Sequence, residues 1–571
     1  MAAPESSIAD IPREVDLLVL GAGAGGMTAA LCASVLGLDV LVAEKAATVG
    51  GTTARSAGSV WVPNSHHSPP GKDSREQALR YLQGTVGNRL RADMAAAYLD
   101  AGPRMVRFLE DNTQVKFRAY AHHPDYSPGV AGSTTSGRVL EPLPFDARVL
   151  GRDFARLSPP LPEFMVFGGM MVDRTDVGQL LSATRSLASL RHAARLALRY
   201  AADRLQHARG TRLVMGNALA GRLFYSLVQR GVPMLTSTPA VELVEESGRI
   251  AGAKLQASAG PIIVRSRRGV VLATGGLSRN PVLRKRLMPG LLSAHSPVAE
   301  CATGDGAGLA IRAGGHLGGN HANAAFWSPV SVRRRRDGST AVFPHLVLDR
   351  GKPGLIAVDG RGRRFVSEAT NYHAFVEAMY AANAGRCHLI CDDAFIAKYG
   401  LGMVRPRRLN LRAAVADGYV TRAESLQALA HRLGIDAEGL AQAVARHNGF
   451  AATGMDLDFA KGSDVYQQNL GDAAHAPNPC IGALATPPFY AVEIQAGEIG
   501  ASCGLVTNAS AQVLRQDGTP APGLYACGND MDSLMAGTYP GPGITLGPAM
   551  TFAFIAAHHI AAAASRSPGA D

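Results

Sequence analysis

The sequence predicts an α/β fold, in which a discontinuous Rossmann-like domain carries an inserted α+β domain. The first observation is an apolar run at 15–20, followed by the glycine-rich turn 21–26, a helical stretch and a second apolar run that ends at Glu44. The others are two later apolar runs, 269–276 and 523–530, which also end in glycine-containing turns. Because buried parallel strands are mostly apolar, we interpret these four runs as strands of the Rossmann-like domain.

The composition narrows the class of protein. The chain has 571 residues, 47% of them hydrophobic and 18% charged, which is typical of a globular protein of two or three domains. The net charge of +11 comes mainly from arginines without interleaved aromatic residues, so we expect no nucleic-acid partner.

Targeting and redox signals indicate a cytoplasmic protein. The seven cysteines are scattered and form no Cys-x-x-Cys pair, so we expect neither a disulfide framework nor a zinc site. The first 14 residues lack the pattern of a signal peptide, and we expect no run of 18 uncharged apolar residues that could span a membrane.

The turn 21–26 reads GAGAGG and contains the pattern G-x-G-x-x-G at Gly21, Gly23 and Gly26. Such glycines allow a tight turn and a close approach of the backbone to a pyrophosphate at a helix N-terminus. Glu44, 23 residues after Gly21, is placed to accept the ribose hydroxyls. The segment therefore predicts a dinucleotide site.

The loop that follows the second strand favours FAD over NAD as the bound dinucleotide. The stretch that follows Glu44 and Lys45 is rich in glycine and small hydroxyl residues, where a nicotinamide domain would usually continue to another strand. No second G-x-G-x-x-G follows a strand, so the sequence favours FAD with no NAD(P)H domain. We expect these residues to bind FAD: Gly21, Gly23, Gly26, Glu44, Lys45, Gly51, Thr52, Thr53, Ser56, Gly58, Thr274, Gly275, Asp305, Asn529 and Leu546.

The predicted FAD-binding domain covers 12–322 and 495–571, and the inserted α+β catalytic domain covers 323–494. A basic helical insertion is expected at about 150–212. It carries seven arginines and one acid between Leu180 and Arg212.

The basic helix has two interpretations. Arg191, Arg195 and Arg199 are four residues apart and share one face. An apolar face is expected from Leu187, Leu190, Ala194, Leu198 and Leu205. The helix is either a solvated surface helix or a contact with an anionic membrane surface, from which an apolar substrate or a quinone arrives.

Five longer segments resemble the FAD-dependent 3-ketosteroid Δ1-dehydrogenases, within the fumarate reductase/succinate dehydrogenase flavoprotein superfamily. These segments are GGTTARSAGSVWVPN at 50–64, PDYSP at 124–128, SGRVLEPLPFDARVLG at 136–151, RGRRFVSEATNYHAF at 361–375 and GTYPGPGITLGPAMTF at 537–552. They follow the family's order over nearly the whole chain, and the Y-P-G-x-G loop is the most specific of them.

The resemblance implies 1,2-dehydrogenation of a 3-ketosteroid bound between two domains, with an external quinone-like electron acceptor. It implies that Tyr372 abstracts the C2 proton, that Tyr126 supports it, and that Tyr539 and the Gly543 amide hold the C3 carbonyl. The chain departs from the family where Thr370–Asn371 stands in place of an apolar residue and proline.

The residues themselves fit this chemistry. Two donors aimed at a carbonyl oxygen, a phenol and a backbone amide, stabilise the enolate-like charge left by proton loss. The helix expected near Ile544 directs its positive end towards the flavin. Because a free tyrosine has a pKa of about 10, a tyrosine base needs either a lowered pKa or alkaline pH.

Three alternatives stay open. A fumarate- or urocanate-type reductase needs an arginine acid and cationic clamps, and a Δ4-type steroid dehydrogenase differs only in regiochemistry. A non-catalytic dinucleotide-fold protein disagrees with the intact Gly50–Gly58 loop. The pairs His122–His123 and His558–His559 have no evident third ligand, so we expect no metal.

Overall fold

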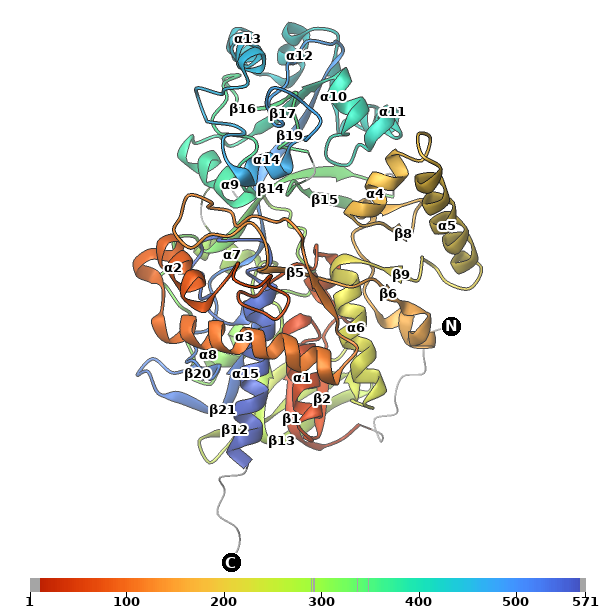
Figure 1. Cartoon of the computed structure of the whole chain (residues 1–571). Helices are drawn as coiled ribbons and strands as arrows, with labels where there is room; N and C mark the ends of the chain where they lie inside the picture. Colours follow the sequence, from red (N-terminus) through yellow and green to blue (C-terminus); the bar gives the residue numbers. More distant parts are fainter. Residues whose placement is uncertain (1–10, 289, 291–292, 336, 348, 565–571) are drawn as a thin grey trace, which may run out of the picture.

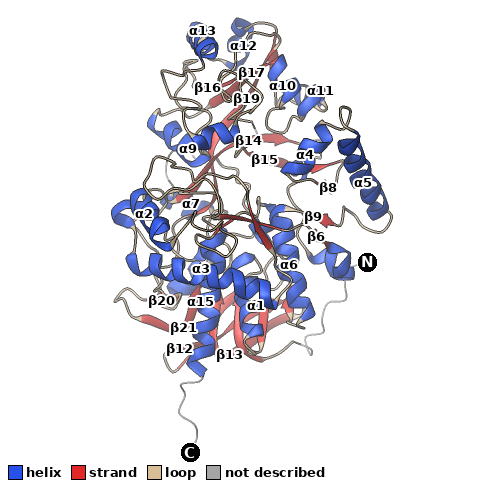
Figure 2. Ribbon diagram, in the orientation of Figure 1, coloured by secondary structure: helices blue, strands red, loops and turns tan. Residues whose placement is uncertain are grey.

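The computed structural model describes residues 11–288, 290, 293–335, 337–347 and 349–564. Two sheets lie towards opposite ends of the molecule, each with helices packed beside it (Figure 1). Figure 2 shows long loops in the zone between them, and the loops of the functional site come from this zone.

The larger sheet has eight strands in the order β10-β2-β1-β13-β12-β11, with β21 also beside β13 and β20 beside β21. Pairing is parallel among β10, β2, β1, β13 and β21, and antiparallel elsewhere. The bounds are β1 Glu14–Leu20, β2 Val40–Ala43, β10 Met234–Leu235, β11 Ala240–Glu246, β12 Arg249–Ala257, β13 Gly260–Leu272, β20 Gln512–Leu514 and β21 Pro520–Ala526. The four predicted apolar runs thus share one sheet.

Six helices accompany this sheet. They are α1 Ala24–Val35, α2 Arg75–Val86, α3 Ala92–Asn112, α6 Met215–Gln229, α8 Asp305–Arg312 and α15 Leu546–Ala564. Helix α1 packs between α15 and α6, and α3 packs on α15. The layered order explains why α1 is buried along most of its length.

The second sheet has the order β15-β14-β19-β17-β16, with β18 beside β19. Its strands are β14 Ala325–Arg334, β15 Thr340–Pro344, β16 Leu355–Val358, β17 Cys387–Asp392, β18 Thr421–Ala423 and β19 Phe489–Ala501. The helices between these strands are α9 Tyr372–Ala381, α10 Asp393–Lys398, α11 Leu411–Ala416, α12 Leu426–Leu433, α13 Ala437–Thr453 and α14 Val465–Leu470. The domain division stays a prediction, and β19 runs across its boundary at residue 494.

Shorter elements lie between the two sheets. A three-stranded sheet has the order β3-β5-β4, with β3 at Val60–Trp61, β4 at Phe117–Ala119 and β5 at Val139–Pro142. Helix α7 covers Pro281–Leu287. Strands β6 Phe145–Asp146 and β9 Arg212–Leu213 pair with each other. They bracket the predicted basic insertion.

The basic insertion forms a helical arm at one flank of the molecule (Figure 1). A hairpin of β7 (Met165–Val166) and β8 (Met170–Met171) leads into α4 (Arg174–Leu181) and α5 (Leu187–Arg204). Leu196 packs inward, whereas the leucines expected to form the apolar face of α5 are exposed.

Helix α15 corrects the expectation that no long uncharged apolar run exists. Residues Leu546–Ala563 are apolar and long enough to cross a membrane by length and composition alone. Within the molecule, however, 61% of that window is buried, largely against α1 and α3. We therefore interpret α15 as a core helix.

Candidate active site

The residues predicted to bind a dinucleotide meet at the carboxyl ends of the parallel strands. The glycine turn lies between β1 and α1, Glu44 follows β2, Thr274 follows β13, and Asn529 follows β21. Ligands of open α/β sheets bind at this edge. Hydrogen bonds join the segments, since the Ala24 amide donates to Thr53 Oγ1 at 3.1 Å and the Ala299 amide donates to Thr52 Oγ1 at 3.1 Å.

The glycines of the turn serve two different purposes. A Cβ on Gly21 would lie 2.2 Å from the Ala273 carbonyl oxygen, and one on Gly26 would lie 1.9 Å from the Gly21 carbonyl oxygen. These glycines allow backbone packing. Gly23 has φ −80°, which suits any residue, and a Cβ there would meet nothing closer than 3.9 Å. The open space beside Gly23 fits a pyrophosphate approaching the backbone.

Glu44 and Lys45 are both held in place. The Glu44 carboxylate accepts from the amides of Ala22 and Ala46, each at 2.7 Å, and burial raises its pKa. Lys45 Nζ lies 2.6 Å from Asp305 Oδ2 and ties the β2 edge to α8. The structure also brings Asp530, which sequence reasoning missed, to the candidate cofactor site. Its buried carboxylate accepts a hydrogen bond from Thr274 Oγ1 at 2.9 Å.

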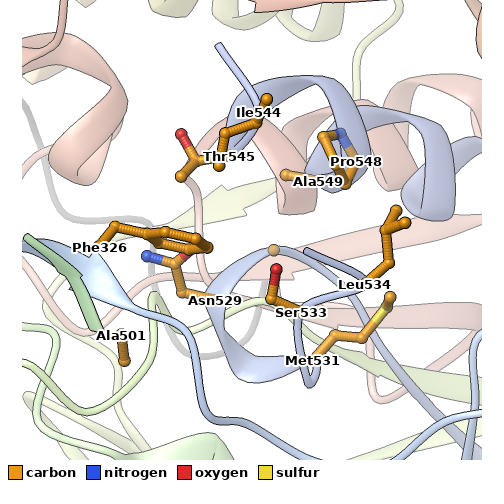
Figure 3. A pocket seen from close by; sticks show the side chains of 11 residues that line it. Phe326, Ala501, Asn529, Met531, Ser533, Leu534, Ile544, Thr545, Pro548 and Ala549 are labelled. Atoms are coloured by element: carbon orange, nitrogen blue, oxygen red, sulfur yellow. The ribbon is translucent and has the colours of Figure 1, made fainter. Parts of the chain in front are cut away.

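A pocket opens where α15 begins, and side chains from several segments face it (Figure 3). Asn529, Ser533 and Leu534 line one side, and Ile544 and Thr545 line another. The ring of Phe326, from β14, also faces it and lies edge-on to Tyr539 with ring centroids 5.5 Å apart. Phe326 therefore lies between this pocket and the tyrosines described next.

The loop Tyr539–Gly543 is fixed by close backbone packing. A Cβ on Gly541 would lie 2.9 Å from Trp61 Nε1. Gly543 has φ +92°, and a Cβ there would lie 2.5 Å from the Ser59 carbonyl oxygen. The Gly543 carbonyl accepts from the Trp61 amide at 3.1 Å, whereas the Gly543 amide donates no hydrogen bond within the described residues.

Three predicted tyrosines form one buried cluster. The Tyr126 hydroxyl donates to the Tyr372 hydroxyl at 3.2 Å. The Tyr539 ring lies 5.0 Å from the Tyr372 ring, nearly perpendicular, and 5.6 Å from the Tyr126 ring, nearly parallel. Segments separated by more than 400 residues thus meet at one point.

Burial governs the ionisation of these phenols. It raises the pKa of Tyr539 to about 12, which keeps its hydroxyl a donor at neutral pH. Burial and the neighbouring tyrosines also hold the pKa of Tyr372 well above its usual value. The surroundings therefore favour the neutral form of each phenol.

Tyr372 owes its position to a helix cap. The Asn371 side chain accepts from the Ala374 amide at 2.9 Å, so α9 begins at Tyr372. The Thr370–Asn371 departure from the family pattern thus supplies an N-cap. The neighbouring His373 accepts from the Trp327 amide at 3.0 Å, and this bond joins α9 to β14.

A buried ion cluster supports Tyr126. Asp125 accepts from Trp61 Nε1 at 2.9 Å and from the Arg138 guanidinium at 2.7 Å, and Arg138 also binds Asp73. Burial outweighs these donors and raises the pKa of Asp125 to about 6. The Tyr126 amide donates to the Pro540 carbonyl at 2.9 Å, so the cluster fixes the loop beside Tyr539.

Tyr466 and Arg350 belong to the same neighbourhood, and sequence reasoning missed both. The Tyr466 ring lies 4.7 Å from that of Tyr126. The buried Arg350 guanidinium lowers the pKa of Tyr126, although less than burial raises it. No motif marks either residue, since each lies in a loop or short helix that only the fold brings here.

The histidine pairs considered at the sequence level do not converge. His558 Nδ1 pairs with the Phe554 carbonyl and His559 Nδ1 with the Tyr525 hydroxyl. A different group, His66, His67 and Glu110, does converge, with His66 Nε2 2.7 Å from Glu110 Oε2. Hydrogen bonds account for that arrangement.

Comparison with known proteins decides the family. The model of a family described as FAD binding domain matches residues 16–546. The 3-oxosteroid 1-dehydrogenase of Mycobacterium tuberculosis (strain ATCC 25618 / H37Rv) is 35% identical, over 96% of this chain and 98% of that protein. The chain belongs to the FAD-dependent 3-oxosteroid 1-dehydrogenase family. This flavoenzyme is thus an FAD-dependent dehydrogenase.

Other relatives show the range of the family. The 4-oxocyclohex-2-ene-1-carboxylate 5-dehydrogenase of Sinomonas cyclohexanicum is 37% identical to the flavoenzyme, over 96% of this chain and 94% of that protein. The crystal structure of 3-ketosteroid delta1-dehydrogenase from Sterolibacterium denitrificans, in complex with 1,4-androstadiene-3,17-dione, superimposes with a TM-score of 0.89. It is 35% identical, and the alignment covers 96% of this chain and 100% of that one.

Two glycine substitutions separate packing from cofactor binding. Gly26→Ala should lower the free energy of unfolding by about 1–3 kcal/mol, because its Cβ overlaps the Gly21 carbonyl. Gly23→Ala should leave the flavin-free protein as stable as before and weaken FAD binding by about tenfold or more. Urea unfolding and FAD titration measure the two effects. Full FAD affinity in Gly23→Ala would contradict the assigned cofactor path.

The ion cluster beneath Tyr126 should carry much of the local stability. Asp125→Ala leaves buried Arg138 short of one partner and should cost about 3–5 kcal/mol in urea unfolding. The control Asp517→Ala removes an exposed carboxylate from a turn and should change stability little. Equal effects of the two substitutions would show that the cluster does not hold the loop.

Proposed function

We propose that the flavoenzyme removes two hydrogens from adjacent ring carbons of a 3-ketosteroid, the proton from C2 and the hydride from C1. The observation that carries the proposal is the convergence of Tyr126, Tyr372 and Tyr539 beside a pocket at the start of α15. Family membership supports the same reaction class.

The carbonyl clamp is the Tyr539 hydroxyl and the Gly543 amide. Both come from one loop whose backbone is packed against Ser59 and Trp61, so their spacing is fixed before substrate binds. Donors fixed in advance stabilise developing negative charge without reorganisation. The high pKa of Tyr539 supports its role as donor.

Tyr372 is the proposed acceptor of the C2 proton, and Tyr126 supports it through the hydroxyl–hydroxyl contact. Once Tyr372 has lost its proton, the Tyr126 hydroxyl can donate to the phenolate and stabilise it. The Asn371 cap holds the Tyr372 backbone at the helix start. FAD, bound at the strand ends, supplies the acceptor for the hydride.

The charge distribution favours an apolar ketone over a carboxylate. A substrate carboxylate beside the tyrosines would need a cation with free donors. The Arg350 guanidinium, which influences Tyr126, already donates to four backbone carbonyls, those of His345, Leu346, Glu368 and Thr370. The second candidate substrate is 4-oxocyclohex-2-ene-1-carboxylate, for which the relative from Sinomonas cyclohexanicum is named.

We also propose a cytoplasmic location, an external quinone-like electron acceptor and peripheral contact with a membrane. The seven cysteines are all free thiols, as a reducing compartment requires. Apolar ketones and quinones both partition into lipid, so a contact with the bilayer would serve both partners.

Removing either phenol should slow turnover. With 4-androstene-3,17-dione and a dye as acceptor, Tyr539→Phe should lower kcat by about 100-fold, since it removes one of two donors to the carbonyl oxygen. Tyr372→Phe should lower it by about 100-fold or more, since it removes the base. The control Tyr399→Phe loses a hydroxyl that binds Asp472 and should retain activity. Full activity in both site variants would refute the roles.

The rate should increase towards alkaline pH. The folded protein raises the pKa of Tyr372 above its ordinary value, so the deprotonated base is scarce at pH 7 and increases as pH rises. Initial rates measured from about pH 7 to about pH 10 should therefore climb. A flat or falling profile, with flavin content unchanged, would contradict a tyrosine base.

A direct competition decides the substrate class. We expect kcat/KM for 4-androstene-3,17-dione to exceed that for 4-oxocyclohex-2-ene-1-carboxylate by about tenfold or more, because a hydrophobic ring system gains burial that the small acid lacks. Dye reduction with each ketone in turn measures the ratio. The reverse ratio would support the second candidate.

A further inference from the structure

The helical arm of α4 and α5 concentrates the exposed apolar surface of the described chain. Sixteen large apolar side chains are strongly exposed within the described residues, and eight of them lie between Val149 and Leu205. Leu198 is 72% exposed and Leu205 is 86% exposed. A contiguous exposed apolar surface on a folded protein commonly marks a contact with a partner or a membrane.

The outward face of α5 is an apolar ridge. Its residues recur at helical spacing and face solvent together, whereas Leu196 on the opposite side packs on Met170 and Val172. The ridge consists of Leu187, Leu190, Ala194, Leu198, Ala201 and Leu205. The arm lies at the outer flank of the molecule, so nothing from either sheet covers this face (Figure 1).

The charged side chains around the ridge that have no ion-pair partner in the described part of the chain are all positive. Residues 146–212 contain six acids, and each one pairs with a cation of the protein. Two examples are Asp176, which binds His192 and Arg212, and Asp203, which binds Arg148; both are buried. Seven arginines of the segment, by contrast, have no ion pair within the described residues: Arg152, Arg174, Arg185, Arg191, Arg195, Arg204 and Arg209.

Arg191 and Arg195 flank the ridge directly, on the same exposed side of α5. An apolar stripe bordered by unpaired cations matches a surface of anionic headgroups over hydrocarbon. A second copy of the chain is a poor match, because a symmetric contact would bring the same arginines together.

We infer that the outward face of α5 docks the flavoenzyme on anionic lipid bilayers, with the leucine ridge inserted at the headgroup level and the arginines on the phosphates. The inference rests on the proposed membrane contact and assigns it to one helix. The arm is tied to the second sheet, since Arg335 binds Glu163 at 2.6 Å and Arg407 donates to the Leu181 carbonyl at 2.7 Å. Docking would therefore orient the whole molecule on the lipid surface.

Vesicle sedimentation of the FAD-loaded full chain tests this docking. The protein should sediment with vesicles of equal parts phosphatidylglycerol and phosphatidylcholine, and much less with phosphatidylcholine alone. Binding should fall as NaCl rises from about 50 mM to about 500 mM, because salt screens the arginines. Arg191→Gln/Arg195→Gln and Leu187→Gln/Leu198→Gln should each weaken binding by about tenfold or more.

Matched controls lie away from the arm. Lys285→Gln/Arg286→Gln removes two exposed cations of α7, and Leu457→Gln removes an apolar side chain that is 75% exposed. Both should bind vesicles like the unmodified protein, and flavin content should confirm that every variant is folded. Equal vesicle binding by all variants, or no binding to anionic vesicles, would overturn the inference.

Two further readouts separate the alternatives. Light scattering without lipid measures the molar mass of each protein in solution. If the arm variants have a lower molar mass than the unmodified protein, the ridge joins copies of the chain and the lipid assignment is wrong. Dye-coupled turnover of a dispersed ketone needs no bilayer, so it should be equal in the arm variants and the unmodified protein. In the unmodified protein, ketone turnover without binding to anionic vesicles would refute the docking and leave the proposed reaction standing. Vesicle binding without ketone turnover would do the reverse.

Discussion

The site depends on the packing of the loop Tyr539–Gly543 against the backbone of Ser59–Trp61. Gly543 adopts a positive φ and approaches Ser59 so closely that no side chain fits there. The contact fixes a phenol hydroxyl and a backbone amide on one side and the start of α15 on the other. A single rigid segment therefore sets both the carbonyl clamp and the end of the helix that faces the cofactor pocket.

The remaining parts of the site are held against this loop by polar groups in the interior. Asp125, Arg138 and Trp61 form a fully buried cluster, and Tyr81 donates to the Pro540 carbonyl at 2.6 Å. Buried charges of this kind are costly unless every partner is present. Removing one partner leaves the others buried and unpaired, so the cluster both stabilises this region and fixes the backbone that places Tyr126.

The sequence predicted the parts of the fold that local physics specifies. The glycine turn at 21–26, the four strands formed by the apolar runs and the helix after Gly543 follow from backbone geometry and hydrophobic pattern, and the structure confirms them. Tyr466 and Arg350 were missed because long-range packing alone brings them to the site, whereas Asp530 ends the predicted run 523–530 and was not singled out there. The assigned roles of Tyr126, Tyr372 and Tyr539 stay predictions, although the fold gathers all three.

The exposed face of α5 shows a second limit of sequence patterns. Helical periodicity predicts that a helix has an apolar face. It does not predict whether the rest of the protein or a lipid bilayer covers that face. Here the ridge faces outward, and the buried side of the helix is defined by Leu196 instead. The long apolar α15 shows the converse, since its composition would permit a membrane span and its packing makes it a core helix.

The central claim is that one loop holds the substrate carbonyl, and a structure of the FAD-loaded flavoenzyme with a bound 3-ketosteroid product tests it most directly. The account predicts the C3 oxygen within about 2.7–3.1 Å of both the Tyr539 hydroxyl and the Gly543 amide, with C2 facing Tyr372. A carbonyl that points elsewhere, or that is held by a cation such as Arg350, would contradict it.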